Sequence, residues 1–414
     1  MASEAKPSEG SPDETHPPMH FASRESAAPP LPVCGLSHVL LALIATLPLA
    51  VDVPANVNVI ITASACVYLG CYRSVKPEPP QEAMTQKDAM RFPIMGSAIL
   101  LSLFVTFKLL PKEYVNAVLS FYFVLLGTIA ITAVILPFVA PFVPPRLRRI
   151  EFGAYNVKIP FLMPDPTDLT ASVPELAGGA LALVFCVWYV AKKHWLANNV
   201  LGLAFSVQGI ECISVGSFQV GLILLWGLFF YDIFWVFFTP VMVSVAKNFD
   251  APIKLLFPRP GDEEKKFSLL GLGDIVIPGI FVALVLRYDV MRHAQARRAA
   301  AGSAAKAKAA EDDEKKSDEQ LAKEEAEELA ALIDSPSPYF WWCYGGYVLG
   351  LGTTIVVMNV FDAAQPALLY IVPGVVGAVM IKALIDGNLK DLYNFSEDGS
   401  TGGEAEEAEA EKDK

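Results

Sequence analysis

The chain has 414 residues, of which 53% are hydrophobic and only 18% carry a charge, and its formal net charge is −12 at pH 7. Soluble domains usually contain about 25% charged residues, so this composition excludes an ordinary soluble domain. Much of the negative charge lies in two acidic stretches, 311–328 and 397–413, and no basic, aromatic-rich face is present. A nucleic-acid-binding protein is therefore excluded as well.

Apolar segments of a length that can cross a membrane follow one another along the chain. The first 32 residues are rich in Pro, Ser, Glu and Ala, which is typical of a disordered tail. A membrane helix needs about 20 apolar residues, and ten segments approach this length: 33–51, 57–73, 92–110, 114–139, 173–191, 196–214, 217–239, 267–286, 339–360 and 366–387. Because only five residues separate the first two, nine spans remain an alternative. The predicted fold is an all-α polytopic membrane protein with about nine, or ten, transmembrane helices.

The distribution of Lys and Arg predicts how these segments are oriented, because cytosolic loops of membrane proteins are enriched in both. With ten spans, one side receives both tails and the loops 74–91, 140–172, 215–216 and 287–338. That side carries more than twice as many Lys and Arg residues as the other and is predicted to be cytosolic. Loop 240–266 is accordingly predicted to face the lumen or the exterior.

Two aspartates lie deep within neighbouring predicted spans. Asp232, in "FFYDIFWVFF", lies seven residues before Thr239, where its span ends; Asp274, in "LGLGDIVIPG", lies seven residues after Phe267, where the next span begins. At about 1.5 Å per residue, both are predicted to lie about 10 Å from the same membrane surface. Acids are costly inside a membrane and usually functional there. Two carboxylates that approach each other share one proton, which suits acid and base catalysis of peptide hydrolysis.

Two glycines, Gly271 and Gly273, precede Asp274. They leave little side-chain bulk, which predicts that another backbone approaches closely or that the helix starts late. Ordinary close packing between membrane helices is the alternative interpretation.

A proline stands at the start of the last span, in "AAQPALLYIVPG" (363–374). Pro366 has no N–H and disfavours a helical conformation at Gln365, so the chain is predicted to enter the membrane as non-helical backbone. Such backbone is tolerated where it is buried in protein or lines a water-filled cavity. It also offers backbone groups with which an extended peptide can pair. An ordinary proline at a helix N-terminus is the alternative interpretation of this motif taken alone.

Together, the motifs "YD", "GLGD" and "QPALLY" resemble the signature of the GxGD intramembrane aspartyl proteases. Longer stretches, such as "KKHWLANNVLGLAFSVQGIE" (192–211) and "FFYDIFWVFFTPVMVSVAK" (229–247), resemble the signal peptide peptidase branch of that family, and the resemblance covers most of 57–389. It implies that Asp232 and Asp274 are catalytic. It also implies that the remaining motif residues support the active site (Tyr231, Gly271, Leu272 and Gly273) or bind substrate (Gln365, Pro366, Ala367 and Leu368).

The resemblance further implies an endoplasmic reticulum protease that hydrolyses remnant signal peptides and other type II-oriented transmembrane segments. The predicted organisation then has six parts. A disordered tail (1–32) is followed by N-terminal helices (33–214) and a catalytic helix pair with the lumenal loop 240–266 (215–290). A charged cytosolic insert (291–335), C-terminal helices (336–389) and an acidic disordered cytosolic tail (390–414) complete the chain. The expected partners are transmembrane helical peptides and the lipid bilayer, and an assembly of identical chains is left open.

Two other functions are compatible with paired intramembrane acids. A proton-coupled transporter or ion channel uses such acids to relay charge, but no internal repeat is apparent. A non-catalytic chaperone for membrane helices would not require the two acids. The six Cys and five His residues show no paired metal-binding spacing, so no metal or cofactor is predicted.

Overall fold

The computed structural model describes residues 32–46, 53–76, 83–148, 150–159, 163–249, 251–259, 267–313, 329–361 and 365–397. Most of the predicted N-terminal tail, the central part of the predicted insert (314–328) and the chain beyond 397 lie outside the described residues.

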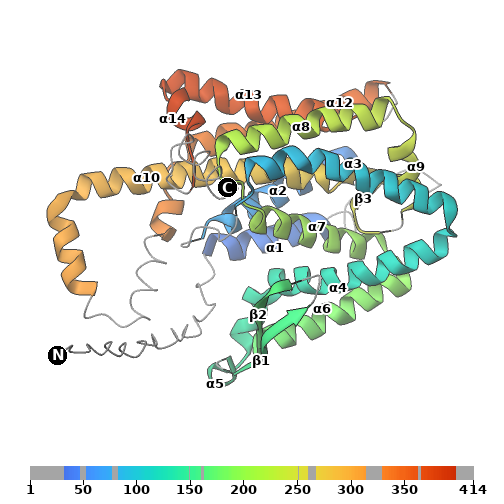
Figure 1. Cartoon of the computed structure of the whole chain (residues 1–414), viewed down its shortest axis with the longest axis horizontal. Helices are drawn as coiled ribbons and strands as arrows, with labels where there is room; N and C mark the ends of the chain where they lie inside the picture. Colours follow the sequence, from blue (N-terminus) through green and yellow to red (C-terminus); the bar gives the residue numbers. More distant parts are fainter. Residues whose placement is uncertain are drawn as a thin grey trace, which may run out of the picture.

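Long helices run side by side along one direction and form the body of the molecule (Figure 1). Each of the ten predicted segments overlaps one of them: α1 (Pro32–Thr46), α2 (Ala55–Ser74), α3 (Gln86–Leu109), α4 (Lys112–Val139), α6 (Val173–Lys192), α7 (Trp195–Cys212), α8 (Phe218–Phe237), α10 (Gly273–Asp313), α12 (Pro338–Phe361) and α13 (Leu368–Asp386). Among the described residues, seven helices are long and apolar enough to cross a membrane: α2, α3, α4 extended by η2 (Ala140–Phe142), α6, α8, α12 and α13. The predicted all-α polytopic fold is confirmed.

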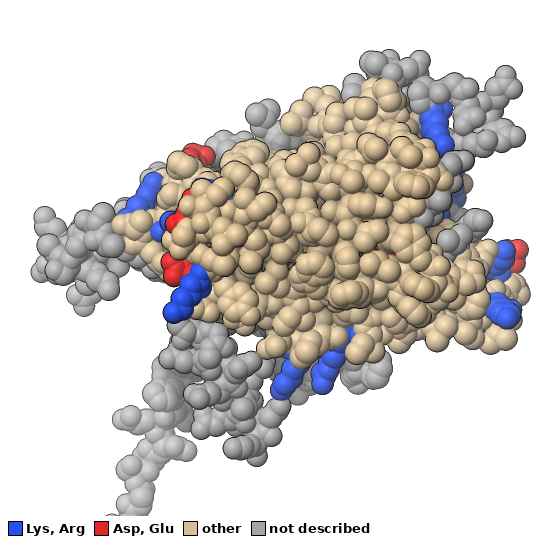
Figure 2. Space-filling model, turned by 90° about the horizontal axis from the view of Figure 1, so that it is seen from above, with Lys and Arg blue, Asp and Glu red and all other residues tan. Residues whose placement is uncertain are grey.

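The centre of the bundle is α10, which packs against α2, α7, α8, α12 and α13. Seven consecutive residues of α10, 280–286, are each at most 3% exposed, so this helix is apolar and buried on every side. The outer helices differ. Large apolar side chains of α3, α4 and α6 are widely exposed, for example Ile94, Phe121 and Val184. Exposed apolar side chains of this kind suit contact with lipid. The face seen in Figure 2 also has a broad middle without Lys, Arg, Asp or Glu.

Two glycines bring the backbones of α12 and α13 into contact. A Cβ added at Gly346 would overlap the carbonyl of Gly374, and one added at Gly350 would lie 2.7 Å from the Cα of Ile371. Small residues permit this close approach between membrane helices. The α12–α13 pair is therefore a tightly packed unit, drawn in orange and red in Figure 1.

Two short antiparallel hairpins interrupt the helices: β1 (Glu151–Ile159) with β2 (Met163–Ser172), and β3 (Lys254–Pro258) with β4 (Phe267–Gly271). The first follows α5 (Pro145–Arg148), and the second follows α9 (Val241–Asn248). The predicted span 267–286 is thus wrong at its start, since its first five residues form β4. The predicted loop 287–338 also begins as helix, because α10 continues to Asp313.

The predicted disordered tail from 390 onwards is wrong for its first residues. Residues Leu389–Tyr393 form α14, and Ser396 pairs with Ser217 at the start of α8. Glu397 is buried and forms an ion pair with Arg287 of α10, whose guanidinium also donates to Ser74 and Ser214. We call this arrangement of 394–397 around Arg287 the C-terminal clasp.

Candidate active site

Asp232 lies in the fourth turn of α8, where only 5% of the residue is exposed. The helix begins at Phe218, and the hydroxyl of its N-cap, Ser217, accepts a hydrogen bond from the Val220 N–H. The Oδ2 atom of Asp232 accepts a hydrogen bond from the backbone N–H of Leu368, at 3.1 Å. This contact joins the first predicted catalytic residue to the proline motif, 136 residues further along the chain.

The start of α13 explains why that N–H is available. Gln365 and Pro366 are not helical, Ala367 lies in a turn, and the helix begins at Leu368. The first N–H groups of a helix have no partner within it, and the positive end of the helix dipole favours a carboxylate at this position. Pro366, Ala367 and Leu368 are buried, whereas Gln365 is half-buried and accepts a hydrogen bond from Tyr370 Oη at 3.4 Å.

Asp274 is the second residue of α10 and follows β4 after a two-residue step. Leu272 fixes this step, because its N–H donates to the carbonyl of Ile253 at 3.0 Å. The two glycines of the motif differ in their surroundings. A Cβ on Gly271 would lie 3.2 Å from Asp274 Oδ2, whereas one on the exposed Gly273 would meet only Ile277, at 3.7 Å. The late helix start predicted from the glycines is observed.

The carboxyl groups of Asp232 and Asp274 lie close enough to interact electrostatically. The packing of α8 against α10 explains this proximity. A Cβ on Gly221 would lie 2.8 Å from the Phe281 ring and 3.4 Å from Leu284. Gly221 lies eleven residues before Asp232, and its neighbours lie seven and ten residues after Asp274, as expected for two antiparallel helices. The sequence predicts both acids at similar depth; in the structure Asp274 follows a strand and lies at the very start of its helix, rather than two turns into one.

Tyr231 is half-buried and points toward α3, where a Cβ added at Gly96 would lie 3.6 Å from its ring. Trp235, one turn later, donates from Nε1 to Ser97 Oγ at 3.0 Å. Sequence reasoning missed both residues of α3. The sequence gives little indication that Gly96 and Ser97 lie near the site, since Gly and Ser are common at any contact between membrane helices.

One edge of the β3–β4 hairpin is covered by α7. The Asn199 side chain accepts from the Leu256 N–H at 2.7 Å and donates to the Leu256 carbonyl at 2.8 Å. Asn198 donates to the Lys254 carbonyl at 2.7 Å. Three outward-facing backbone groups of β3 are thus paired with two buried asparagines.

The opposite edge of the hairpin belongs to β4 and has no partner strand among the described residues. Backbone groups of alternate residues face opposite edges of an antiparallel pair. Lys254 and Leu256 face α7, and the residues opposite them in the register are Gly271 and Leu269. The N–H and C=O groups of Leu269 and Gly271 therefore face away from β3, within five residues of Asp274. An extended peptide can pair with such an edge.

Across the part of the chain that the structure describes, no group of three or more His, Cys, Asp or Glu side chains is arranged to hold a metal ion. The chemistry available at this site is that of two carboxyl groups, a helix N-terminus and a strand edge.

Comparison with known proteins places the chain in a family. Residues 76–399 match the family model described as signal peptide peptidase. The chain is 37% identical to the signal peptide peptidase of Mus musculus and 36% identical to that of Homo sapiens, in each case over 82% of both chains. It is 31% identical to a probable intramembrane protease of Schizosaccharomyces pombe, over 82% of this chain and 94% of the relative. The chain belongs to the signal peptide peptidase family and is a multi-pass intramembrane protease.

Proposed function

We propose that this protein is an aspartic endopeptidase in which Asp232 and Asp274 share one proton and hydrolyse peptide bonds within the membrane. The observation that carries the proposal is that two carboxyl groups from adjacent antiparallel helices lie within electrostatic range of each other, one of them held by the N–H of Leu368. Two like charges within this range disfavour double ionisation, so the pair retains a proton.

The reaction then proceeds without a covalent intermediate. The ionised carboxylate takes a proton from a water molecule as the water oxygen attacks the scissile carbonyl carbon. The protonated carboxyl gives its proton to the carbonyl oxygen, which produces a gem-diol. The carboxyl formed in the first step then protonates the departing nitrogen, and the other carboxylate recovers a proton from a diol hydroxyl. The C–N bond breaks, and the pair returns to its one-proton state.

The substrate is a transmembrane segment that becomes extended near its scissile bond. The open edge of β4 supports this proposal, because it offers the backbone groups of Leu269 and Gly271 beside Asp274. The names of the mouse and human relatives point to signal peptides, and the resemblance of the motifs points also to other type II-oriented segments.

We further propose that the protein lies in the endoplasmic reticulum membrane, with loop 240–266 lumenal and the C-terminal tail cytosolic. The excess of Lys and Arg in the loops assigned to the cytosol supports this orientation. Two regions assigned to the cytosol, the loop 287–338 and the C-terminal tail, meet in the fold, since Arg287 pairs with Glu397. In Figure 1, α9 and β3 lie at the opposite end of the bundle from α14.

The experiment is cleavage of a synthetic signal peptide by purified protein in detergent, with products identified by mass spectrometry. We expect Asp232→Asn and Asp274→Asn each to abolish cleavage, because neither variant can form the one-proton pair. Asp289→Asn is the matched control. Asp289 is a buried carboxylate of α10 that also accepts a backbone N–H, from Phe340 at 2.9 Å, and its replacement should preserve most activity.

Appreciable hydrolysis by either active-site variant would contradict the paired-aspartate mechanism. A wild-type protein that cleaves nothing, but carries protons across a vesicle membrane, would instead support the transporter hypothesis.

A further inference from the structure

A buried hydroxyl without a partner lies on α12. Tyr347 is fully buried, and its Oη makes no hydrogen bond with any described residue. A buried phenol usually finds a hydrogen-bond partner, and leaving a buried donor unpaired destabilises the fold. Phenylalanine would fill nearly the same volume without this cost. The hydroxyl therefore needs an explanation beyond packing.

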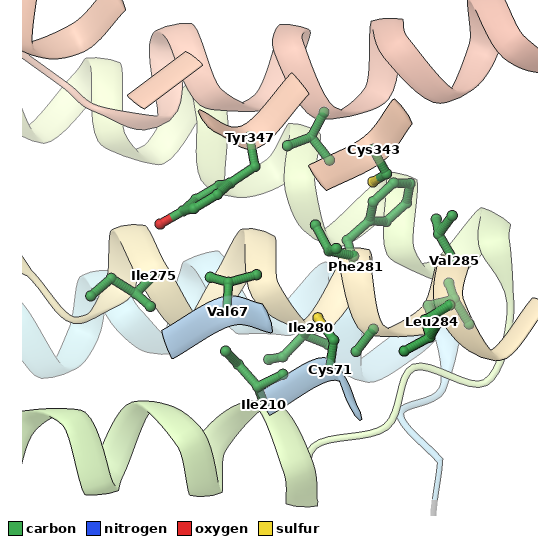
Figure 3. Close-up of a cluster of buried hydrophobic side chains, with 14 of the residues drawn as sticks. Val67, Cys71, Ile210, Ile275, Ile280, Phe281, Leu284, Val285, Cys343 and Tyr347 are labelled. Atoms are coloured by element: carbon green, nitrogen blue, oxygen red, sulfur yellow. The ribbon is translucent and has the colours of Figure 1, made fainter. Parts of the chain in front are cut away.

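The hydroxyl of Tyr347 points toward the start of α10. Figure 3 shows its oxygen directed toward the part of that helix where Ile275 lies, the residue after Asp274. Four groups lie within electrostatic range of the phenol: Asp274 on α10, Cys66 and Cys71 on α2, and Tyr344 on α12 itself.

Three of these four groups already have other partners. Each donates to a backbone carbonyl: Cys66 to Leu203, Cys71 to Gly279 and Tyr344 to Ser64. Asp274 is the exception, because no described residue forms a hydrogen bond with its carboxyl group. The Tyr347 hydroxyl, a donor without an acceptor, and the Asp274 carboxyl, an acceptor without a donor, thus lie in the same region.

The two aspartates differ in this respect. Asp232 accepts the N–H of Leu368 at the start of α13, whereas Asp274 has no such donor. Tyr347 follows Gly346, one of the residues at which α12 touches α13. The unit that supplies the donor to Asp232 therefore also holds Tyr347 in place.

We propose that Tyr347 is a positioning residue for Asp274: when substrate is bound, its hydroxyl donates a hydrogen bond to the Asp274 carboxyl, directly or through one water molecule. The carboxyl is then held toward Asp232, and each member of the pair has one donor from the α12–α13 unit. This inference rests on the proposed paired-aspartate function.

The test compares Tyr347→Phe with Tyr339→Phe in purified full-length protein, using a synthetic signal peptide. Tyr339 is equally buried on the same helix, two turns earlier, and its Oη likewise makes no hydrogen bond with a described residue, but it lies beside Arg292 and Lys382 rather than near Asp274, so it is a matched control. We expect Tyr347→Phe to lower kcat about 10-fold or more, with KM and Tm close to those of the wild type. Tyr339→Phe should keep kcat within about twofold.

The pH profile separates a positioning role from a packing role. A donor to a carboxylate favours its charged form, so loss of the donor should move the acidic and basic limbs of the kcat profile about one unit toward higher pH. Because Asp274 interacts with Asp232, the pair titrates as a unit. Replacing Tyr347 by 3-fluorotyrosine keeps the shape and strengthens the donor, and should move both limbs toward lower pH.

Wild-type kcat in Tyr347→Phe, or a fall in kcat without movement of the limbs in either variant, would overturn the inference. Asp274→Asn is measured in parallel. If that variant cleaves the peptide, the proposed function itself fails; if it is inactive while Tyr347→Phe behaves as wild type, only the role of Tyr347 fails.

Discussion

The Asp232 carboxyl is positioned by a backbone group rather than by a side chain. Leu368 is the first residue of α13, so its N–H has no acceptor within the helix and is free to donate to Asp232. The availability of this donor depends on Pro366, which disfavours a helical conformation in the preceding residue. The proline therefore influences the Asp232 carboxyl from two residues before Leu368, through the position at which the helix begins.

Replacing this proline tests that dependence. In Pro366→Ala, α13 is free to extend toward its N-terminus, and the Leu368 N–H would then bond within the helix instead of reaching Asp232. We expect kcat for a synthetic signal peptide to fall about 10-fold or more, with the protein still folded. Pro373→Ala is the control, because Pro373 is an exposed proline inside the same helix. Equal activity of the two variants would mean that Pro366 only marks a helix start.

At the scale of elements, the helices were predictable and β4 was not. Long apolar segments indicate membrane helices by length alone, and each such segment contains a helix. The run "FSLLG" is apolar and continues into α10, so hydrophobicity does not distinguish a strand from the first turn of a helix. What makes it a strand lies elsewhere in the chain, in the pairing with β3 and in the side chains of Asn198 and Asn199 that hold β3.

The open edge of β4 predicts a defined effect of proline. In Leu269→Pro the lost N–H faces away from β3, so the hairpin should survive, as proline is tolerated on strand edges. A substrate strand would lose one backbone donor, and we expect KM to rise about fivefold or more. Leu269→Ala is the control, since it removes the side chain but keeps the N–H. An unchanged KM in the proline variant, together with a wild-type Tm, would show that substrate does not pair at this edge.

For the molecule as a whole, the sequence predicts the helical bundle but not the long-range contact between Glu397 and Arg287. The alternation of apolar segments and basic loops predicts both the fold class and which loops share a side. Acidic composition predicts a disordered tail from 390, yet residues up to Glu397 are held in place. The buried ion pair with Arg287, 110 residues away, and backbone hydrogen bonds with Gly216 and Phe218 hold them, and no local pattern in these segments reveals the contacts. The candidate active site was more accessible to sequence reasoning, because its acids stand out against apolar surroundings, whereas Tyr347 does not.

The C-terminal clasp joins residues 395–397 to both helices that carry the aspartates. The N–H of Phe218 donates to the Phe395 carbonyl, and Glu397 pairs with Arg287, each partner being 8% exposed. Removing one partner of a buried pair leaves an uncompensated charge, which costs about 3–5 kcal/mol. We therefore expect Glu397→Ala to lower the Tm of the purified protein by several degrees and to shorten its active lifetime at 37 °C.

Asp391→Ala is the matched control for the clasp, because Asp391 is an exposed acid of the adjacent helix α14. Its removal should leave Tm unchanged. Replacing both partners by apolar residues, as in Arg287→Met with Glu397→Leu, removes the buried charges together and should restore much of the lost stability. If Glu397→Ala melts at the same temperature as Asp391→Ala, the clasp does not stabilise the fold. If the double variant is less stable than Glu397→Ala, the hydrogen bonds from Arg287 to Ser74 and Ser214 contribute more than the ion pair itself.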